Sequence, residues 1–401
     1  MKSNKLNVLF ITIAWPDRGN RNLYSDLMHE FKREGHEVCV AYADENIDRP
    51  QLHEEEGINV LRFPTFKIRK AGKFKKALSL AFLGSNFKRY IKKHFPDRSF
   101  DLLIGHTPPI TLSGLMKYLK NKYNAFFYLL LKDIWPHSSV DLNIIKENGL
   151  IYKFFRWHEK RMYRIADIIG CMSPKNVEYV LDNNSYLSTQ KVEECPNAIK
   201  PRDLQSERRQ EIRSKYNIPQ DATVFIFSGN LSKGHGLEFY IDAIEKLNSY
   251  EKAYFLIGGS GTQYQYLKET LEKRQLDNVF LYEWLPKEDF LDVLLASDVG
   301  VILLSSKYTV PQFPSRLLAY LEASKPVLCA VNQNTDIGSI VENADCGITT
   351  IHGDMETFIS SIKFLSENED FRNKCAKNAR KLLEERYTSN QAYNIIINNL
   401  N

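Results

Sequence analysis

Two positively charged side chains, Lys233 and Arg316, lie in segments whose chemistry suits an anion. Lys233 follows the predicted strand 223–228 in a glycine-containing loop, and Arg316 follows Ser315 at the start of a predicted helix over 315–324. Free backbone N–H groups at a helix N-terminus bind phosphate well when a cation lies beside them. The alternative is that Lys233 is a solvated loop residue and that Ser315 only caps its helix.

Two further polar residues, His106 and Asp133, each follow a short apolar segment that is predicted to be a strand. Residues at the carboxyl ends of parallel strands are where open α/β sheets bind their ligands. Asp133 could orient or deprotonate a hydroxyl group, or it could cap the following turn. His106 stands in a loop that Pro108 and Pro109 would fix, although a capping histidine satisfied by the backbone is the alternative.

Residues 62–98 contain twelve Lys and Arg side chains and a single acid, Asp97. Aromatic and aliphatic residues are interleaved among them, which is typical of an element lying on an anionic membrane, where each cation contributes about 1 kcal/mol. The alternatives are a helix with one core face and one solvated basic face, and a nucleic-acid site, which no recognised binding module supports. The predicted membrane patch comprises Lys67, Arg69, Lys70, Lys73, Lys75, Lys76, Lys88 and Arg89.

The elements that position these residues alternate between short apolar segments and amphipathic ones. In the first half, strands are predicted at residues 6–13, 37–42, 58–63, 102–105, 126–131 and 166–173, with helices at 23–33 and 111–122. In the second half, strands are predicted at 223–228, 253–257, 278–282, 299–304 and 326–331, with helices at 236–247, 287–297, 315–324 and 354–366. This alternation predicts a doubly wound α/β fold with parallel sheets.

The chain has 401 residues, enough for two or three domains of roughly 100–200 residues each. Residues 196–201 contain two prolines and are predicted to link two domains. We therefore predict domains at 1–200 and 201–375, with residues 376–401 as a C-terminal helix that returns to the first domain. Ligands would bind in the cleft between the domains, at the carboxyl ends of the strands.

Composition excludes several classes of protein. A content of 43% hydrophobic and 26% charged residues is close to the globular average, which excludes a disordered or collagen-like chain. The net charge of +5 is too small to indicate nucleic-acid binding by itself. No apolar run is long enough to span a membrane, and the first residues resemble a strand, not a signal peptide. Six scattered cysteines indicate buried, reduced thiols in a cytoplasm.

Several ordered segments resemble the retaining, nucleotide-sugar-dependent glycosyltransferases of family 4, which have the GT-B fold of two Rossmann-like domains. Each segment is weak alone, but their order and spacing are specific and cover nearly the whole chain. The segments are residues 35–38, 166–169, 196–199, 228–231, 257–261, 295–299 and 314–327. Residues 132–136 further resemble a bacterial branch that builds surface polysaccharides and often transfers N-acetylated amino sugars.

The resemblance implies roles for individual residues. His106 corresponds to a histidine that faces the anomeric region of the donor sugar, and it forms the predicted catalytic pair with Asp133. Trp284 could stack on the nucleotide base or be buried against the next helix. The loop 16–20 resembles one that closes over donor and acceptor. The residues predicted to bind the donor are Gly19, Asn230, Lys233, Trp284, Ser315, Arg316 and Glu322, and Arg18 or Arg21 could also meet a phosphate.

The sequence departs from the family at its E-x7-E motif. Pro311 and Ala319 stand where the two glutamates belong, so both carboxylates are absent. Glu322 lies about one helical turn further on and could reach the ribose, although an exposed surface glutamate is the alternative. The family also usually has an arginine where Asn230 stands. These departures leave a catalytically silent subunit open as an alternative.

We predict a retaining transferase that moves a sugar of N-acetylated hexosamine type from a UDP donor to a polyprenyl-linked saccharide. UDP rests on the resemblance alone. No nucleophile–base pair and no Asp-x-Asp motif is evident, so the leaving phosphate would accept the proton and no metal or other cofactor is expected. The protein would be cytoplasmic and peripheral on the inner face of the membrane, without a nucleic-acid partner. A silent subunit that binds a partner or lipid, and a sugar-nucleotide epimerase of the same fold, are the alternatives.

Overall fold

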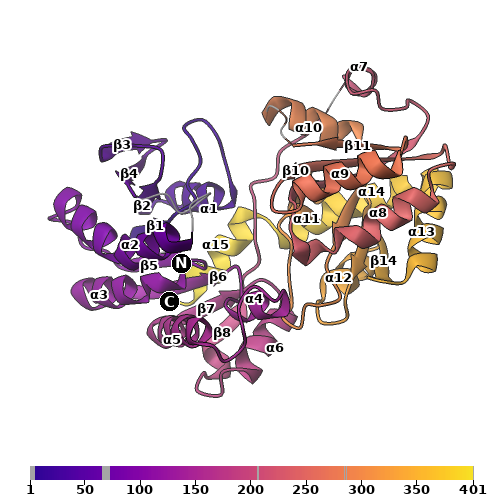
Figure 1. Ribbon diagram of the computed structural model, residues 1–401. Helices are drawn as coiled ribbons and strands as arrows, with labels where there is room; N and C mark the ends of the chain where they lie inside the picture. Colours follow the sequence, from indigo (N-terminus) through magenta and orange to yellow (C-terminus); the bar gives the residue numbers. More distant parts are fainter. Residues whose placement is uncertain (1–4, 66–72, 206, 284, 286, 401) are drawn as a thin grey trace. The chain divides into compact units, whose positions relative to one another are not determined.

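The structure, a computed structural model, describes residues 5–65, 73–205, 207–283, 285 and 287–400; at 73–81, 287 and 288 it describes the backbone alone. It divides the chain into two compact units (Figure 1). Unit 1 comprises Met1–Lys200 and Thr388–Asn401, and unit 2 comprises Pro201–Tyr387.

Unit 1 is built on an eight-stranded sheet in the order β3-β4-β2-β1-β5-β6-β7-β8, parallel except for the edge strand β3. The central strands are buried along nearly their whole length, because helices cover both faces of the sheet. The strands are β1 (Asn7–Thr12), β2 (Glu37–Asp44), β3 (Gln51–Glu55), β4 (Ile58–Pro64), β5 (Leu102–His106), β6 (Phe126–Leu131), β7 (Ile168–Cys171) and β8 (Val192–Glu194).

The helices of unit 1 form two groups. In one group, α1 and α15 pack on each other and on the sheet, with Phe31 of α1 against Tyr393 of α15. The other is a row in which α2 contacts α3 and α3 contacts α5 (Figure 1). The helices are α1 (Leu23–Arg33), α2 (Lys73–His94), α3 (Ser113–Tyr123), α4 (His137–Asp141), α5 (Leu150–Ile165), α6 (Pro174–Asp182) and α15 (Ser389–Asn398).

Unit 2 is built on a six-stranded, fully parallel sheet in the order β11-β10-β9-β12-β13-β14. Its strands are β9 (Thr223–Asn230), β10 (Ala253–Ser260), β11 (Val279–Tyr282), β12 (Val299–Leu303), β13 (Val327–Val331) and β14 (Gly347–Ile351). Its helices are α7 (Arg209–Lys215), α8 (Leu237–Lys246), α9 (Tyr264–Arg274), α10 (Lys287–Ala296), α11 (Arg316–Glu322), α12 (Ile337–Asn343), α13 (Met355–Glu367) and α14 (Glu369–Arg386).

The prediction of two doubly wound α/β units with parallel sheets is confirmed. All six cysteines are buried and are free thiols, as expected. Among the described residues, no helix combines the length and the hydropathy that a membrane span requires.

The C-terminal return to unit 1 begins at Thr388, not at residue 376 as predicted. Helix α14 stays with unit 2, where it contacts α11 and where Arg380 donates a hydrogen bond to the carbonyl of Arg202 (2.7 Å). The chain then rejoins unit 1, because the backbone N–H of Ser389 donates to the carbonyl of Ile199 (2.8 Å). The first division of the chain, between Lys200 and Pro201, lies inside the two-proline segment.

Candidate functional site

The side chain of Arg316 is the most conspicuous charged group at the carboxyl edge of the unit 2 sheet. Its guanidinium carbon lies 4.0 Å from the centre of the Phe227 ring in β9, and its Nη2 lies 3.0 Å from Nε2 of His235. Nη1 is buried and has no hydrogen-bond partner among the described residues. An arginine is protonated at neutral pH wherever it lies, so this site holds a positive charge with an unused donor.

His235 supports the guanidinium as a neutral ring. Burial, followed by the charge of Arg316, lowers the pKa of His235 to about 3. Its Nδ1 lies 3.2 Å from the hydroxyl of Ser232 and accepts from the backbone N–H of that residue (3.4 Å), while Nε2 faces Nη2 of Arg316. The histidine therefore orients the guanidinium without supplying a negative charge to neutralise it.

Glycines allow the ends of β9 and β10 to approach each other closely beside Arg316. A Cβ on Gly259 would lie 1.8 Å from the carbonyl oxygen of Gly229, and one on Gly261 would lie 2.2 Å from that of Leu231. Gly229 itself has a φ of 121° and leaves room for Arg316, whose Nη2 lies 3.7 Å from its ideal Cβ position. These glycines allow the close backbone approach, and residues 258–261 form the corner between β10 and α9.

Three other predicted donor-binding residues lie near this edge. Asn230 is the last residue of β9, Lys233 lies in the turn that follows it, and Ser315 directly precedes Arg316. All three are exposed. Ser315 occupies the N-cap position of α11, as the alternative interpretation expects, but its side chain makes no capping hydrogen bond. Trp284 lies outside the described residues.

Glu322 has a structural partner, which differs from the prediction that it is a donor-binding or an exposed residue. Its side chain is buried, and its two oxygens accept hydrogen bonds from Nε (3.0 Å) and Nη2 (2.7 Å) of Arg202. The backbone N–H of Arg202 also donates to it (3.0 Å). Glu322 thus fixes the segment entering unit 2 to α11, and this role leaves its carboxylate fully engaged.

His106 lies at the carboxyl end of β5 in unit 1, as predicted. The ring is buried, stacks on Tyr24 with centroids 4.5 Å apart, and places Nε2 2.9 Å from the hydroxyl of Thr12. That hydroxyl oxygen already accepts from the backbone of Ala14, so Thr12 can donate to Nε2 and Nδ1 then carries the proton. Nδ1 has no side-chain hydrogen-bond partner among the described residues; burial lowers the pKa of His106 to about 4, an effect that the backbone of Thr107 partly opposes. The residue is a neutral, unused donor.

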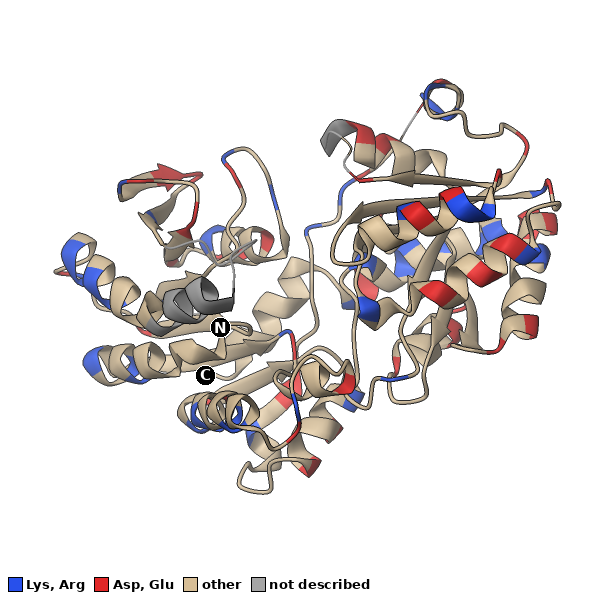
Figure 2. Ribbon diagram, viewed as in Figure 1, with Lys and Arg blue, Asp and Glu red and all other residues tan. Residues whose placement is uncertain are grey.

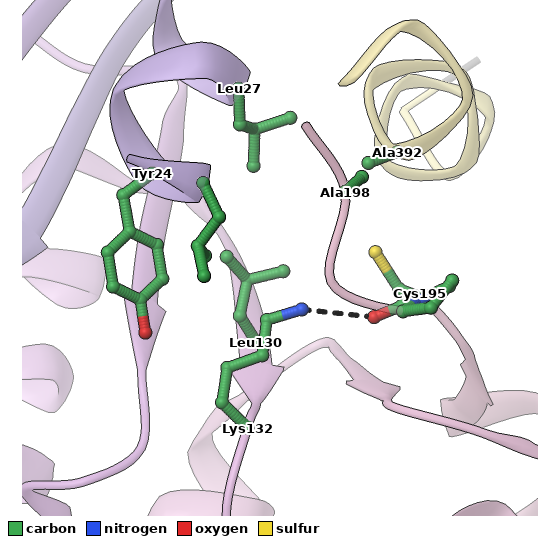
Figure 3. Close-up of a pocket in the computed structure, with 9 residues that line it drawn as sticks. Tyr24, Leu27, Leu130, Lys132, Cys195, Ala198 and Ala392 are labelled. Carbon is green, nitrogen blue, oxygen red and sulfur yellow. Dashed lines mark hydrogen bonds between the residues drawn. The ribbon is translucent and has the colours of Figure 1, made fainter. Parts of the chain in front are cut away.

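Asp133 and Lys132 follow β6, beside His106. Burial raises the pKa of the Asp133 carboxyl and lowers that of the Lys132 ammonium, so both groups shift toward their neutral forms. The Thr107 hydroxyl donates to the carbonyl of Asp133 (3.0 Å) and ties this loop to that of His106. Figure 3 shows Lys132 in a small pocket with Tyr24, its Nζ donating to the carbonyl of Cys195 (3.2 Å).

The loop after β1 contains the predicted residue Gly19, which has a φ of 80°. Arg21 donates to Glu56 (3.5 Å), so its charge is shared with an acid of unit 1. This loop lines a second pocket of unit 1, whose walls are Trp15, Pro16, Arg18, Gly19, Asn20, Arg21, Ser25, His29, Glu55 and Glu56.

The predicted basic patch falls partly outside the described residues. Those outside are Lys67, Arg69 and Lys70. The residues of α2 whose backbone alone is described are Lys73, Lys75 and Lys76. The two whose side chains are described and exposed are Lys88 and Arg89.

Most apolar residues of this segment that the structure describes do not face outward, although Phe82 is 51% exposed. Phe63, Leu83, Phe87 and Ile91 are fully buried. The described part of α2 is therefore a helix with one core face and one solvated basic face. These four side chains are part of the core of unit 1 and are not available to a membrane, whereas membrane contact by the exposed Lys88 and Arg89 stays a prediction.

Three residues of these edges were not singled out from the sequence for the roles the structure gives them. Thr12 is hydrogen-bonded to His106 and Tyr24 stacks on it, and His235 is hydrogen-bonded to Arg316. The partners lie 94 and 81 residues apart along the chain in the Thr12 and His235 contacts, so no local pattern connects them. Only the position of Thr12 at the end of a predicted strand was an available signal.

Comparison with known structures identifies the architecture. The structure of HepE from Anabaena, in complex with UDP and glucose, superposes with a TM-score of 0.70 over 98% of this chain and 99% of that chain, at 14% identity. The chain has the GT-B fold. Within this GT-B chain, residues 208–382 match the family model described as Glycosyl transferases group 1. That match covers the strand ends around Lys233 and Arg316.

Two bacterial relatives share sequence with this GT-B chain. The probable glycosyltransferase WbjE of Pseudomonas aeruginosa is 25% identical over 256 residues, which is 62% of each chain. The chain therefore spans less than two thirds of that relative's length. The putative colanic acid biosynthesis glycosyl transferase WcaI of Escherichia coli (strain K12) is 22% identical over 328 residues, or 77% of this chain and 79% of that protein.

Proposed function

We propose that the protein is a retaining glycosyltransferase that moves a sugar of N-acetylated hexosamine type from a UDP-sugar to a polyprenyl-linked saccharide. The observation that carries this proposal is the half-buried side chain of Arg316, whose Nη1 is buried and lacks a partner among the described residues. A buried charge without a counter-ion is unfavourable unless a ligand supplies one. The diphosphate of a nucleotide sugar is such a ligand, and Lys233 is exposed at the same strand edge to contact it.

The residues of unit 1 suit the acceptor side of this reaction. Nδ1 of His106 is a neutral donor that can bind a sugar hydroxyl without competing for protons at neutral pH. Asp133 can accept a hydrogen bond from the hydroxyl that attacks. In the proposed reaction that hydroxyl forms the new bond to the anomeric carbon as the bond to the diphosphate breaks, and the departing phosphate takes the proton. No essential metal is needed for these steps.

The relatives support the cellular setting of the proposal. WcaI is named for colanic acid biosynthesis, and the HepE structure contains UDP and glucose. We therefore infer a UDP donor and a role in bacterial surface-polysaccharide assembly, such as capsule or O-antigen. We propose a lipid-linked acceptor for this reaction, and with it a location at the cytoplasmic face of the membrane.

One observation favours a second candidate, a catalytically silent subunit of the same fold. Pro311 and Ala319 replace both glutamates of the E-x7-E motif, and Glu322 is engaged by Arg202 and does not substitute for them. A silent subunit would retain the fold and the surface of unit 1 while binding nucleotide weakly or not at all.

Calorimetric titration of the purified protein with UDP, GDP, ADP and CMP, without added metal, tests the proposal. Selective binding of UDP is the expected result and shows that the site tolerates Ala319. It would be followed by a screen of UDP-sugars for release of UDP in the presence of a polyprenyl-linked saccharide. Binding of none of the four nucleotides contradicts the UDP-sugar proposal and favours the silent subunit.

A further inference from the structure

Helix α5 and the loop before it carry several large apolar side chains that are exposed. Leu150 is 87% exposed, Phe154 52% and Trp157 55%. These three are spaced i, i+4, i+7 and therefore lie on one face of the helix. We name the apolar ridge by the exposed residues that form it: Ile144, Leu150, Ile151, Phe154 and Trp157.

The opposite face of α5 fixes the direction of the apolar ridge. Met162 and Tyr163 are buried, and the Tyr163 hydroxyl donates to the buried carboxylate of Glu159 (3.0 Å). Phe155 packs edge-on against Trp135, with ring centroids 4.0 Å apart. The ridge is therefore held outward by a packed helix and is not the result of a loose segment.

Charge around the apolar ridge is mostly positive, although the exposed Glu147 lies between Ile144 and Leu150. Helix α5 contains five Lys and Arg residues and one acid, Glu159, which is buried and paired with Arg156. Arg161 lies over the Trp157 ring at 5.2 Å. The neighbouring helix α3 and residues 82–94 of α2 contain no acid. Figure 2 shows Lys and Arg along these three helices.

We propose that the apolar ridge of α5 is the element that inserts into the surface of an anionic lipid bilayer, with the basic side chains of α5, α3 and α2 contacting the headgroups. Aromatic and aliphatic side chains flanked by cations are the composition of an interfacial helix. The absence of exposed acids on α5 argues against a second copy of this chain as the occupant, because two such faces would repel. The idea rests on the proposed function, which supplies the lipid-linked acceptor.

Co-sedimentation with vesicles tests the ridge directly. The full-length protein is mixed at low salt with vesicles of phosphatidylcholine alone or with phosphatidylglycerol. We expect binding to the anionic vesicles, and a fall of about tenfold in the partition coefficient for Phe154→Glu combined with Trp157→Glu. The matched control is Phe364→Glu, which changes an exposed phenylalanine on α13 of unit 2 and should leave binding unchanged.

A second measurement locates the inserted residue. Brominated lipids quench tryptophan fluorescence only at short range, so vesicle-bound wild-type protein should be quenched and Trp157→Phe should lose most of that quenching. Because phenylalanine preserves the apolar surface, Trp157→Phe should still sediment with vesicles. Equal quenching in the two proteins would overturn the assignment of the ridge.

Other outcomes are equally decisive. Undiminished vesicle binding by the Phe154→Glu, Trp157→Glu variant overturns the proposal even if sugar transfer is established. Loss of a dimer in that variant, seen by analytical ultracentrifugation, assigns the ridge to a second copy and also overturns it. The titration with UDP separates the two ideas: if wild-type protein binds no nucleotide but the ridge variants lose vesicle binding, the transfer reaction fails and the lipid-binding surface stands.

Discussion

The carboxyl edges of the two sheets hold ionisable groups that burial shifts in the same direction but leaves in different charge states. In unit 1, His106, Lys132 and Asp133 all have pKa values shifted toward the neutral form. In unit 2, burial also lowers the pKa of Arg316, which contacts His235 and Phe227, but the guanidinium keeps its charge because its ordinary pKa is far above neutral. The edge of unit 1 therefore holds groups that are shifted toward their neutral forms, whereas the edge of unit 2 holds a guanidinium with an unpaired Nη1 among the described residues.

This difference indicates what each edge can bind. A guanidinium that cannot lose its proton is stabilised by a ligand that carries negative charge, such as a phosphate. Neutral donors and acceptors are suited to hydroxyl groups, which carry no charge and need only hydrogen bonds. The following predictions test whether the two edges differ in this way, beginning with the largest expected effect.

Replacing the fixed cation should have the largest effect on nucleotide binding. We expect Arg316→Met to weaken UDP binding about 100-fold, because charge-assisted hydrogen bonds to the phosphates are lost. Isothermal titration calorimetry measures the change. Arg274→Met, which removes a partly exposed arginine on α9, is the control and should bind UDP as wild type does. Unchanged affinity in Arg316→Met would remove the distinction between the edges.

The buried histidines should make stability depend on pH in both units. An unfolded histidine has a pKa near 6.5, whereas burial lowers that of His106 to about 4 and that of His235 to about 3. Between about pH 6.5 and pH 4 the unfolded chain binds protons that the native chain does not, so the free energy of unfolding falls as the pH falls.

Near pH 5 the loss should be about 2 kcal/mol for each histidine. Calorimetric scans near pH 7 and pH 5 should show both units losing stability. In His106→Gln, the loss in unit 1 should be smaller while that in unit 2 is unchanged. An identical pH response in the variant would mean that His106 does not resist protonation.

Removing His106 should affect turnover and leave nucleotide binding intact. We expect His106→Ala to lower kcat about tenfold, since the substrate loses one hydrogen bond, with the affinity for UDP unchanged. Steady-state rates with the UDP-sugar found in the screen give kcat. His53→Ala, in the edge strand β3, is the matched control. Wild-type turnover in His106→Ala would exclude the residue from the site.

The exposed lysine of unit 2 should matter least. Lys233→Ala should weaken UDP binding about threefold, because a solvated ammonium contributes much less than an enclosed guanidinium. Lys246→Ala, at the far end of α8, should have no effect in the same titration. A loss as large as that of Arg316→Met would show that exposure does not separate the two cations.

The sequence predicted the regular parts of the fold and missed what depends on distant partners. The apolar run Phe126–Leu131 and the periodic segment Leu23–Arg33 were predicted with the bounds they have in the structure. The edge strand Gln51–Glu55 has a single apolar residue, so it depends on pairing with β4 and shows no pattern of its own.

Side-chain roles were harder to predict for the same reason. The positions of His106 and Asp133 at strand ends followed from the pattern of strands. The role of Glu322 depends on Arg202, 120 residues away, so spacing along α11 gave no indication of it. Both α2 and α5 mix cations with aromatic residues, and only packing decides that Phe87 is buried and that Phe154 is exposed.

The return of the chain at Thr388 has a consequence for biosynthesis. Tyr393 and Ile396 of α15 are buried in the core of unit 1, and the Tyr393 hydroxyl lies 2.8 Å from Nε2 of His36. A nascent chain leaves the ribosome N-terminus first, so all of unit 2 emerges before α15 does. The apolar surface of unit 1 that α15 covers therefore stays exposed until unit 2 has been synthesised. Residues made after unit 2 complete the domain that was begun first.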